Sequence, residues 1–207
     1  MSQSIPEPAY IEPSSIEPDN VANYDVADGV ARLDTALRQL LAERSIALAD
    51  TLLVGIRTGG LWVAEALANH AGLSSELADA HTGALNIAFY RDDFTRIGLH
   101  PKVTPSSLPF SIDDRHILLV DDVIRSGRTI RAAMNELFDF GRPASITLVC
   151  LCDAGQRELP VQPDLAAMRV RLPDSRRVKL RKDPDLRLEI VGPHVDSAPQ
   201  SEPSRNQ

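Results

Sequence analysis

Short apolar runs alternate with segments of helical periodicity along most of the chain. Runs of aliphatic and branched residues typical of buried strands occupy residues 51–56, 85–90, 116–120 and 146–152. Apolar residues recur at helical spacing in three other segments, at residues 26–48, 61–71 and 130–140. Strands that alternate with helices predict an α/β fold, in which a parallel sheet is flanked by helices.

The remaining segments predict irregular structure at both ends of the chain and one long loop. Residues 1–25 are acidic and rich in proline, which predicts a disordered tail, and residues 192–207 predict a second one. A single domain would then span residues 26–191. Residues 91–111 contain three prolines and predict a long flexible loop. Three short β-like runs predict a small C-terminal β element or edge strands, at residues 168–172, 177–180 and 186–191.

The formal net charge of −7 comes from the two ends of the chain. Residues 1–28 and 192–207 together hold eight of the 29 acidic residues and only one of the 22 basic residues, so the rest of the chain is formally neutral. This balance does not indicate a nucleic-acid-binding protein. One local segment, residues 169–191, is basic, and it is either a solvated face or an RNA-binding patch.

The cysteines and the absence of targeting signals favour a cytoplasmic location. Cys150 and Cys152 lie two residues apart on one predicted strand, where a mutual disulfide is geometrically poor, so we expect reduced thiols. No apolar run approaches the length of a membrane helix, and the N-terminus has no export signal pattern. We therefore expect no membrane partner.

The strongest chemical signal is the stretch of residues 117–129. A buried strand ends at Asp121 and Asp122, and a polar turn with Gly127 then leads into a helix. Glycine permits close approach of an anion to the backbone, and the first turn of a helix offers unpaired N–H groups. Two carboxylates suit the hydroxyls of a ribose, directly or through Mg²⁺. A phosphorylated ribose satisfies both halves, whereas the structural alternative is a strand followed by a capped helix.

This stretch resembles the phosphoribosyl-pyrophosphate (PRPP) motif of type I phosphoribosyltransferases. The version Asp121-Asp122-Val123 followed by Ser126-Gly127-Arg128-Thr129 is most similar to the family of bifunctional pyrimidine-operon regulators and uracil phosphoribosyltransferases. The resemblance covers residues 30–165, and further matching segments lie at residues 54–60, 89–94, 141–144 and 157–160.

The resemblance implies a type I phosphoribosyltransferase fold with a flexible loop, and the reaction of uracil with PRPP to give uridine monophosphate (UMP) and pyrophosphate. It implies Mg²⁺ as cofactor, held indirectly by Asp121 and Asp122 through ribose or water. The expected catalytic residues are these two carboxylates, which orient the ribose and stabilise positive charge near C1′, and Arg91 on the flexible loop, which contacts a phosphate. The loop expected to hold the pyrophosphate consists of Arg57, Thr58, Gly59 and Gly60. The ribose and its 5′-phosphate are expected on Asp121, Asp122, Val123, Ile124, Arg125, Ser126, Gly127, Arg128 and Thr129. Implied partners are PRPP, uracil, UMP and UTP, RNA, and further copies of the chain in a dimer or larger homo-oligomer.

The segment after the next strand is expected to recognise the base through Asp153, Gly155 and Arg157. Here the chain departs from the family pattern Asp-Arg-Gly-His-Arg-Glu-Leu-Pro, because Ala154 and Gln156 replace the arginine and the histidine. Two alternatives therefore stay open. One is a nucleotide-sensing, RNA-binding regulator of transcription with little or no enzymatic activity, and the other is transfer to a different base, such as a purine.

Overall fold

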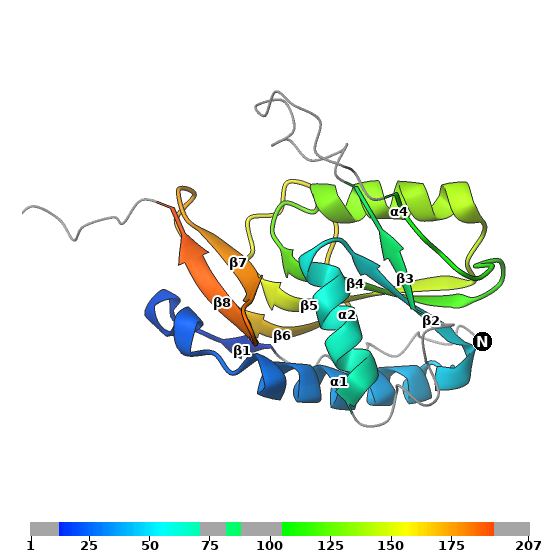
Figure 1. Cartoon of the computed structure of the whole chain (residues 1–207), viewed down its shortest axis with the longest axis horizontal. Coiled ribbons are helices and arrows are strands. Elements are labelled where there is room, and N and C mark those ends of the chain that lie inside the picture. The colour runs from blue at the N-terminus through cyan, green and yellow to red at the C-terminus, as the bar shows by residue number, and fades with distance from the viewer. Residues whose placement is uncertain (1–12, 71–81, 88–104, 193–207) are drawn as a thin grey trace, which may run out of the picture.

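A computed structural model of the chain describes residues 13–70, 82–87 and 105–192. Its centre is a six-stranded sheet in the order β1-β6-β5-β4-β2-β3, and every pair of neighbouring strands is parallel (Figure 1). The strands are β1 Ser14–Ser15, β2 Thr51–Ile56, β3 Thr82–Leu85, β4 His116–Ile124, β5 Ser145–Asp153 and β6 Leu165–Arg169. The predicted fold class, a parallel sheet flanked by helices, is confirmed.

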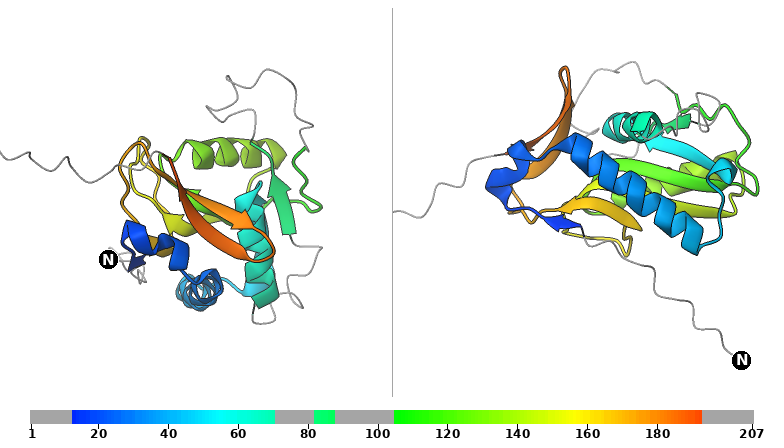
Figure 2. Two further views of the ribbon diagram at one scale, coloured as in Figure 1. Left: turned by 60° about the vertical axis from the view of Figure 1, so that its left-hand side comes forward. Right: turned by 90° about the horizontal axis from the view of Figure 1, so that it is seen from below.

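Helices cover both faces of this sheet and define two hydrophobic clusters (Figures 1 and 2). Helices α1 (Val26–Glu43) and α2 (Gly59–Asn69) pack on one face, where α1 buries the apolar stripe seen in the sequence. Helix α4 (Arg128–Phe140) covers the other face through Ile130, Ala133 and Leu137. The carboxylate of Asp25 starts α1 by accepting hydrogen bonds from the backbone N–H groups of Ala27 and Asp28.

The order of the strands reverses between β2 and β4, and a ligand site is expected at this reversal. From β2 the chain crosses to β3 at one edge of the sheet and returns to β4 on the other side of β2. The helix that follows β2 therefore packs on one face and the helix that follows β4 on the opposite face. In open α/β sheets, ligands bind in the crevice that such a reversal leaves at the carboxyl ends of the strands.

A separate antiparallel hairpin completes the domain. Strands β7 (Arg177–Lys182) and β8 (Leu186–Val191) pair with each other and bury Val178, Leu180 and Leu188 against the α1 side of the core. Figure 2 shows this hairpin rising across the end of the sheet. The predicted small C-terminal β element is therefore present, although only Met168 and Arg169 of the predicted run at residues 168–172 lie in a strand, as the end of β6 in the main sheet.

Residues 13–25 differ from the disordered tail that their composition predicts. Strand β1 pairs with Met168 and Arg169 of β6, and a 3₁₀ helix follows at Pro18–Asn23. Val21 is fully buried in the core, so this short segment buries enough apolar surface to be held in place. Residues 1–12 and 193–207, and the predicted loop up to residue 104, lie outside the described residues.

Candidate functional site

The loops that follow β2, β4 and β5 meet at the carboxyl edge of the sheet and surround a cavity of about 440 Å³. Residues of strand β7 of the hairpin also line the cavity. The cavity is lined by Thr58, Gly59, Trp62, Asp122, Val123, Arg125, Ser126, Arg128, Thr129, Ala154, Gln156, Glu158, Leu172, Arg176, Arg177, Val178, Lys179 and Leu180. Most of the residues predicted for PRPP are thus brought together.

The two adjacent carboxylates have different environments. Asp122 lines the cavity, whereas Asp121 is 2 % exposed and does not line it. This difference follows from the strand, because β4 continues through both residues to Ile124 and successive side chains point to opposite faces. The Asp121 carboxylate accepts a hydrogen bond of 3.1 Å from the Asp122 backbone N–H. The buried carboxylate thus helps to hold the backbone of Asp122 in place.

The turn between β4 and α4 has the form expected of an anion-binding turn. Gly127 adopts a left-handed conformation with φ of 88° and caps the helix without a side-chain hydrogen bond. The Ser126 hydroxyl accepts a 3.3 Å hydrogen bond from the Arg128 N–H, and the Arg128 guanidinium pairs with Glu158 at 2.7 Å. The start of α4 therefore presents backbone N–H groups and the positive end of its dipole to the cavity.

The loop after β2 approaches β4 so closely that only glycine fits. A Cβ atom on Gly60 would lie 2.5 Å from the backbone oxygen of Val120, and one on Gly59 would lie 2.3 Å from Oδ2 of Asp122. The glycines therefore bring the Thr58–Gly59 backbone against the Asp122 carboxylate. Arg57, which carries the charge of this loop, is half-buried and is not among the residues that line the cavity.

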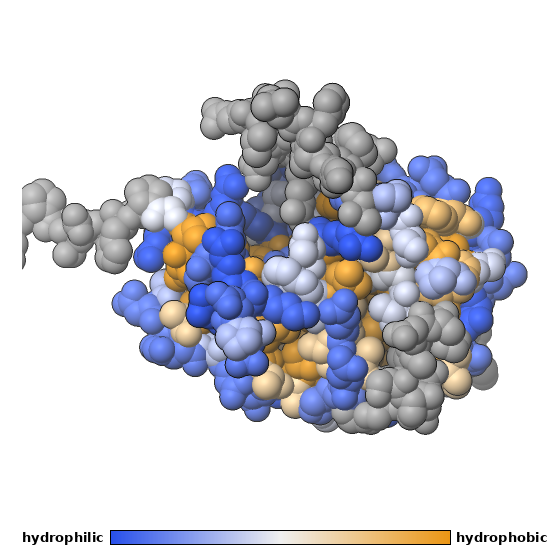
Figure 3. All heavy atoms as spheres, in the orientation of Figure 1, coloured by the Kyte–Doolittle hydropathy of each residue, from blue (hydrophilic) through white to orange (hydrophobic). Residues whose placement is uncertain are grey.

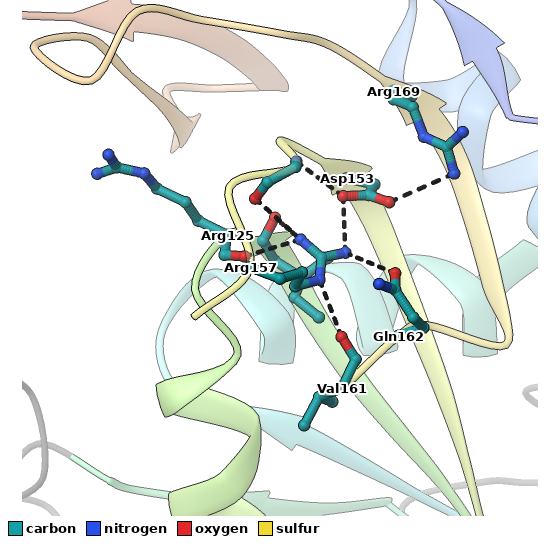
Figure 4. A network of polar contacts seen from close by, with 8 residues as sticks. Arg125, Asp153, Arg157, Val161, Gln162 and Arg169 are labelled. Atoms are coloured by element: carbon teal, nitrogen blue, oxygen red, sulfur yellow. Dashed lines mark hydrogen bonds and ion pairs between the residues drawn. The ribbon is translucent and has the colours of Figure 1, made fainter. Parts of the chain in front are cut away.

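The predicted base-side residues Asp153, Gly155 and Arg157 do not line the cavity. Figure 4 shows Arg157 lying beneath the loops, with its guanidinium enclosed by oxygen atoms. It donates to the Asp153 carboxylate at 2.7 Å and to the backbone oxygens of Arg125 at 2.8 Å, Val161 at 2.9 Å and Gly155 at 3.0 Å. Asp153 also accepts from the Gly155 N–H at 2.9 Å. In the described structure these residues hold the loop together instead of facing a ligand.

Sequence reasoning missed the residues of the hairpin side. Arg176, Arg177, Val178, Lys179 and Leu180 line the cavity, and Trp62 of α2 does so too. Figure 3 shows hydrophilic residues gathered over the outward side of the hairpin. The alternation of exposed and buried residues along β7 signals an amphipathic strand, but it does not indicate what the strand covers. We call Leu172 and residues 176–180 the roof of the cavity.

Three further observations concern metals, thiols and membranes. Within residues 13–70, 82–87 and 105–192, no group of three or more His, Cys, Asp or Glu residues is arranged to hold a metal ion. Both cysteines are free and buried, and burial raises the pKa of the Cys150 and Cys152 thiols well above the usual value. No helix in the described part of the chain is long and apolar enough to cross a membrane.

Comparison with known proteins identifies the family. The model of the phosphoribosyl transferase domain matches residues 24–170. The chain belongs to the phosphoribosyltransferase family. A protein of Pseudomonas paraeruginosa named "Bifunctional protein PyrR" is 55 % identical over 163 residues, which are 79 % of this chain and 92 % of the relative. A Pseudomonas fluorescens protein of the same name is 49 % identical over 164 residues, which are 79 % of this chain and 94 % of that protein. The predicted place among the PyrR phosphoribosyltransferases is confirmed.

Solved structures of phosphoribosyltransferases share the fold. The hypoxanthine phosphoribosyltransferase of Trypanosoma cruzi superposes with a TM-score of 0.55 at 15 % identity, over 82 % of this chain and 93 % of that one. The purine phosphoribosyltransferase of Pyrococcus horikoshii gives a TM-score of 0.50 at 24 % identity, over 75 % of this chain and 88 % of that one. At this level of identity the likeness supports the type I phosphoribosyltransferase fold alone.

Proposed function

We propose that the protein transfers the phosphoribosyl group of PRPP to uracil, giving UMP and pyrophosphate, and that it also regulates pyrimidine biosynthesis genes. One observation carries the enzymatic part: the Asp122 carboxylate, the glycine turn at the start of α4 and the Thr58–Gly59 backbone line a single cavity. The bifunctional PyrR relatives support both roles.

Each part of PRPP has a matching surface in this cavity. The turn at residues 126–129 binds the 5′-phosphate through backbone N–H groups and hydroxyls. The Asp122 carboxylate orients the ribose hydroxyls and favours the positive charge that develops near C1′ as the pyrophosphate leaves. The loop at residues 57–60 holds that pyrophosphate. Arg91 stays a proposed phosphate contact, and it lies outside the described residues.

The residues present fit a substrate-carried Mg²⁺. This ion prefers oxygen ligands and keeps several waters, so one or two carboxylates and the phosphates of a substrate suffice to hold it. Asp122 lines the cavity and would reach it through ribose or water, with Asp121 supporting from the buried side. When bound, Mg²⁺ neutralises charge on the departing pyrophosphate.

The base is expected between the β5–β6 loop and the roof. Ala154 and Gln156, the two departures from the family pattern, both line this part of the cavity. Asp153, Gly155 and Arg157 would then contribute to base binding by shaping the loop. Transfer to a different base is the competing outcome, because both departures from the family pattern lie in the part of the cavity where the base is expected.

The regulatory part rests on the hairpin. Strand β7 carries the exposed basic residues Arg177, Lys179 and Arg181, of which the first two also line the cavity. A basic strand of this kind suits the phosphates of RNA. We propose a homo-oligomer of at least two copies as the RNA-binding form. The two free, buried thiols support a cytoplasmic setting. RNA affinity that falls steeply with salt, without uracil turnover, would favour a regulator with little activity.

The test is a uracil phosphoribosyltransferase assay with PRPP and Mg²⁺ on the full chain. Asp122→Asn should lower turnover by a factor of at least about 100, because the carboxylate acts on charge that develops in the transition state. Its melting temperature should stay near that of the wild type. Asp139→Asn, an exposed carboxylate on α4, is the matched control and should keep full activity. Absence of PRPP binding by calorimetry would refute the proposal.

A further inference from the structure

Gln156 does not offer its amide to a ligand, although it lines the cavity. Its backbone is in the left-handed region with φ of 57°, and its Nε2 donates to the backbone oxygen of Leu172 and to the Asp174 carboxylate, both at 2.8 Å. Its Oε1 accepts from Nε of Arg125. Both N–H bonds and the carbonyl oxygen of the amide are therefore used within the protein.

These contacts join three segments that are distant in sequence. Arg125 belongs to the turn after β4, Gln156 to the loop after β5, and Leu172 and Asp174 to the connection that leads into β7. Arg125 reinforces the link, since its guanidinium donates to the Asp174 backbone oxygen at 3.4 Å. Leu172 already belongs to the roof of the cavity, and the rest of the roof, residues 176–180, follows directly after this junction.

We propose that Gln156 is a positioning residue for base binding, which fixes the roof over the cavity and leaves recognition of the base to the roof and to backbone groups. This rests on the proposed transfer to uracil. The roof supplies the apolar side chains of Leu172, Val178 and Leu180 and the cations that line the cavity beside them. A displacement of residues 172–174 would carry these side chains away from the base.

The phosphate turn is held by other contacts, so the two effects are separable. The Arg125 backbone oxygen is held by Arg157 at 2.8 Å, and the Ile124 oxygen accepts from the Ala154 N–H at 2.9 Å. Neither contact involves the Gln156 side chain. Loss of that side chain should therefore weaken the binding of the base and leave the binding of PRPP nearly unchanged.

The test combines kinetics with hydrogen exchange in Gln156→Ala. The KM for uracil should rise about tenfold, the effect of losing roughly one net hydrogen bond, while the KM for PRPP stays within about twofold. Backbone amides of residues 172–180 should exchange faster than in the wild type. Asp174→Ala removes one partner of Gln156, so it should raise the KM for uracil and the exchange rate of residues 172–180 by less than Gln156→Ala does. In the variant that carries both substitutions, the two effects should not add. Gln39→Ala is the control, because it removes an exposed glutamine that hydrogen-bonds Glu43 on α1. It should change neither the KM for uracil nor the exchange rate of residues 172–180.

The outcomes separate the positioning role from its rivals. A higher KM for uracil with unchanged exchange in residues 172–180 would mean that Gln156 reads the base directly, and the proposal would be wrong. An equal rise of the KM for PRPP would point to general damage to the site and would also overturn it. If the wild type turns over no uracil, the proposed function fails, yet exchange still tests whether Gln156 holds the roof.

Discussion

Arg157→Met separates the two roles open to the Asp153–Arg157 pair. The pattern of the sequence predicts a contact with the base, whereas the structure buries the pair, with the Arg157 side chain 12 % and the Asp153 side chain 4 % exposed. Methionine keeps most of the length of the side chain and removes its charge. It leaves the Asp153 carboxylate buried without its closest cation and takes the donor from four backbone oxygens.

The expected loss of stability follows from the burial. Removing one partner of a buried ion pair costs about 3–5 kcal/mol, because the remaining charge is left uncompensated. Arg169 lies 3.6 Å from Asp153 and keeps one cation nearby, so we expect the lower part of that range, about 3–4 kcal/mol. For a protein of this size each kcal/mol lowers the melting temperature by about 2–4 °C, so the decrease should be roughly 6–16 °C.

Thermal unfolding followed by circular dichroism measures this decrease. Arg171→Met, at an exposed arginine outside the cavity lining, is the matched control and should change stability by less than about 0.5 kcal/mol. Asp153→Asn combined with Arg157→Met should recover part of the loss, because no unpaired charge is then buried. A melting temperature within about 2 °C of the wild type, together with a large rise in the KM for uracil, would refute the structural role.

Three further predictions test the site, the N-terminal segment and the thiols. Gly59→Ala should abolish uracil turnover with a stability loss of only about 1–3 kcal/mol, because the added Cβ displaces the Asp122 carboxylate; retained turnover would contradict the close approach. Val21→Ala should cost about 2 kcal/mol in urea unfolding, because the residue is fully buried, and an unchanged midpoint would mean that the segment is not part of the core. Cys150 and Cys152 should resist iodoacetamide at pH 8 in the folded protein and react rapidly in urea, because burial raises the pKa of both thiols; fast labelling of the folded protein would contradict this.

The sheet and the phosphate turn could be predicted because their signals are local. Apolar runs of strand length give β2, β4 and β5, and the glycine turn lies between the carboxylate pair and α4, as the sequence predicts. The register of parallel strands then brings the loops after β2 and β4 together without further information. One local detail was wrong: β4 runs on through both carboxylates, so Asp121 and Asp122 point to opposite sides.

What the sequence could not reveal depends on contacts between distant segments. Charged residues such as Asp153 and Arg157 have the same identity whether they face a ligand or are buried against each other. The hairpin was recognisable from its alternation, but its place over the cavity is fixed by the ties from Gln156 and by packing against α1. A proline-rich composition likewise hid the fact that Val21 reaches the core.

The covered edges of the sheet protect the protein from aggregation at high concentration. A sheet edge with free N–H and C=O groups is a template on which another chain can pair, and this is a common start of aggregation. Here β1 is hydrogen-bonded along β6, with Ile16 N–H donating to the Arg169 oxygen at 2.8 Å, and at the other edge Ala84 and Ser107 exchange hydrogen bonds of 2.9 and 2.8 Å. The two residues of β1 thus cover the β6 edge of the sheet, and the pair formed by Ala84 and Ser107 covers part of the β3 edge. A truncation that removed residues 13–16 would leave the residues of the cavity in place, but it would expose the edge of β6 and make the protein aggregate more readily.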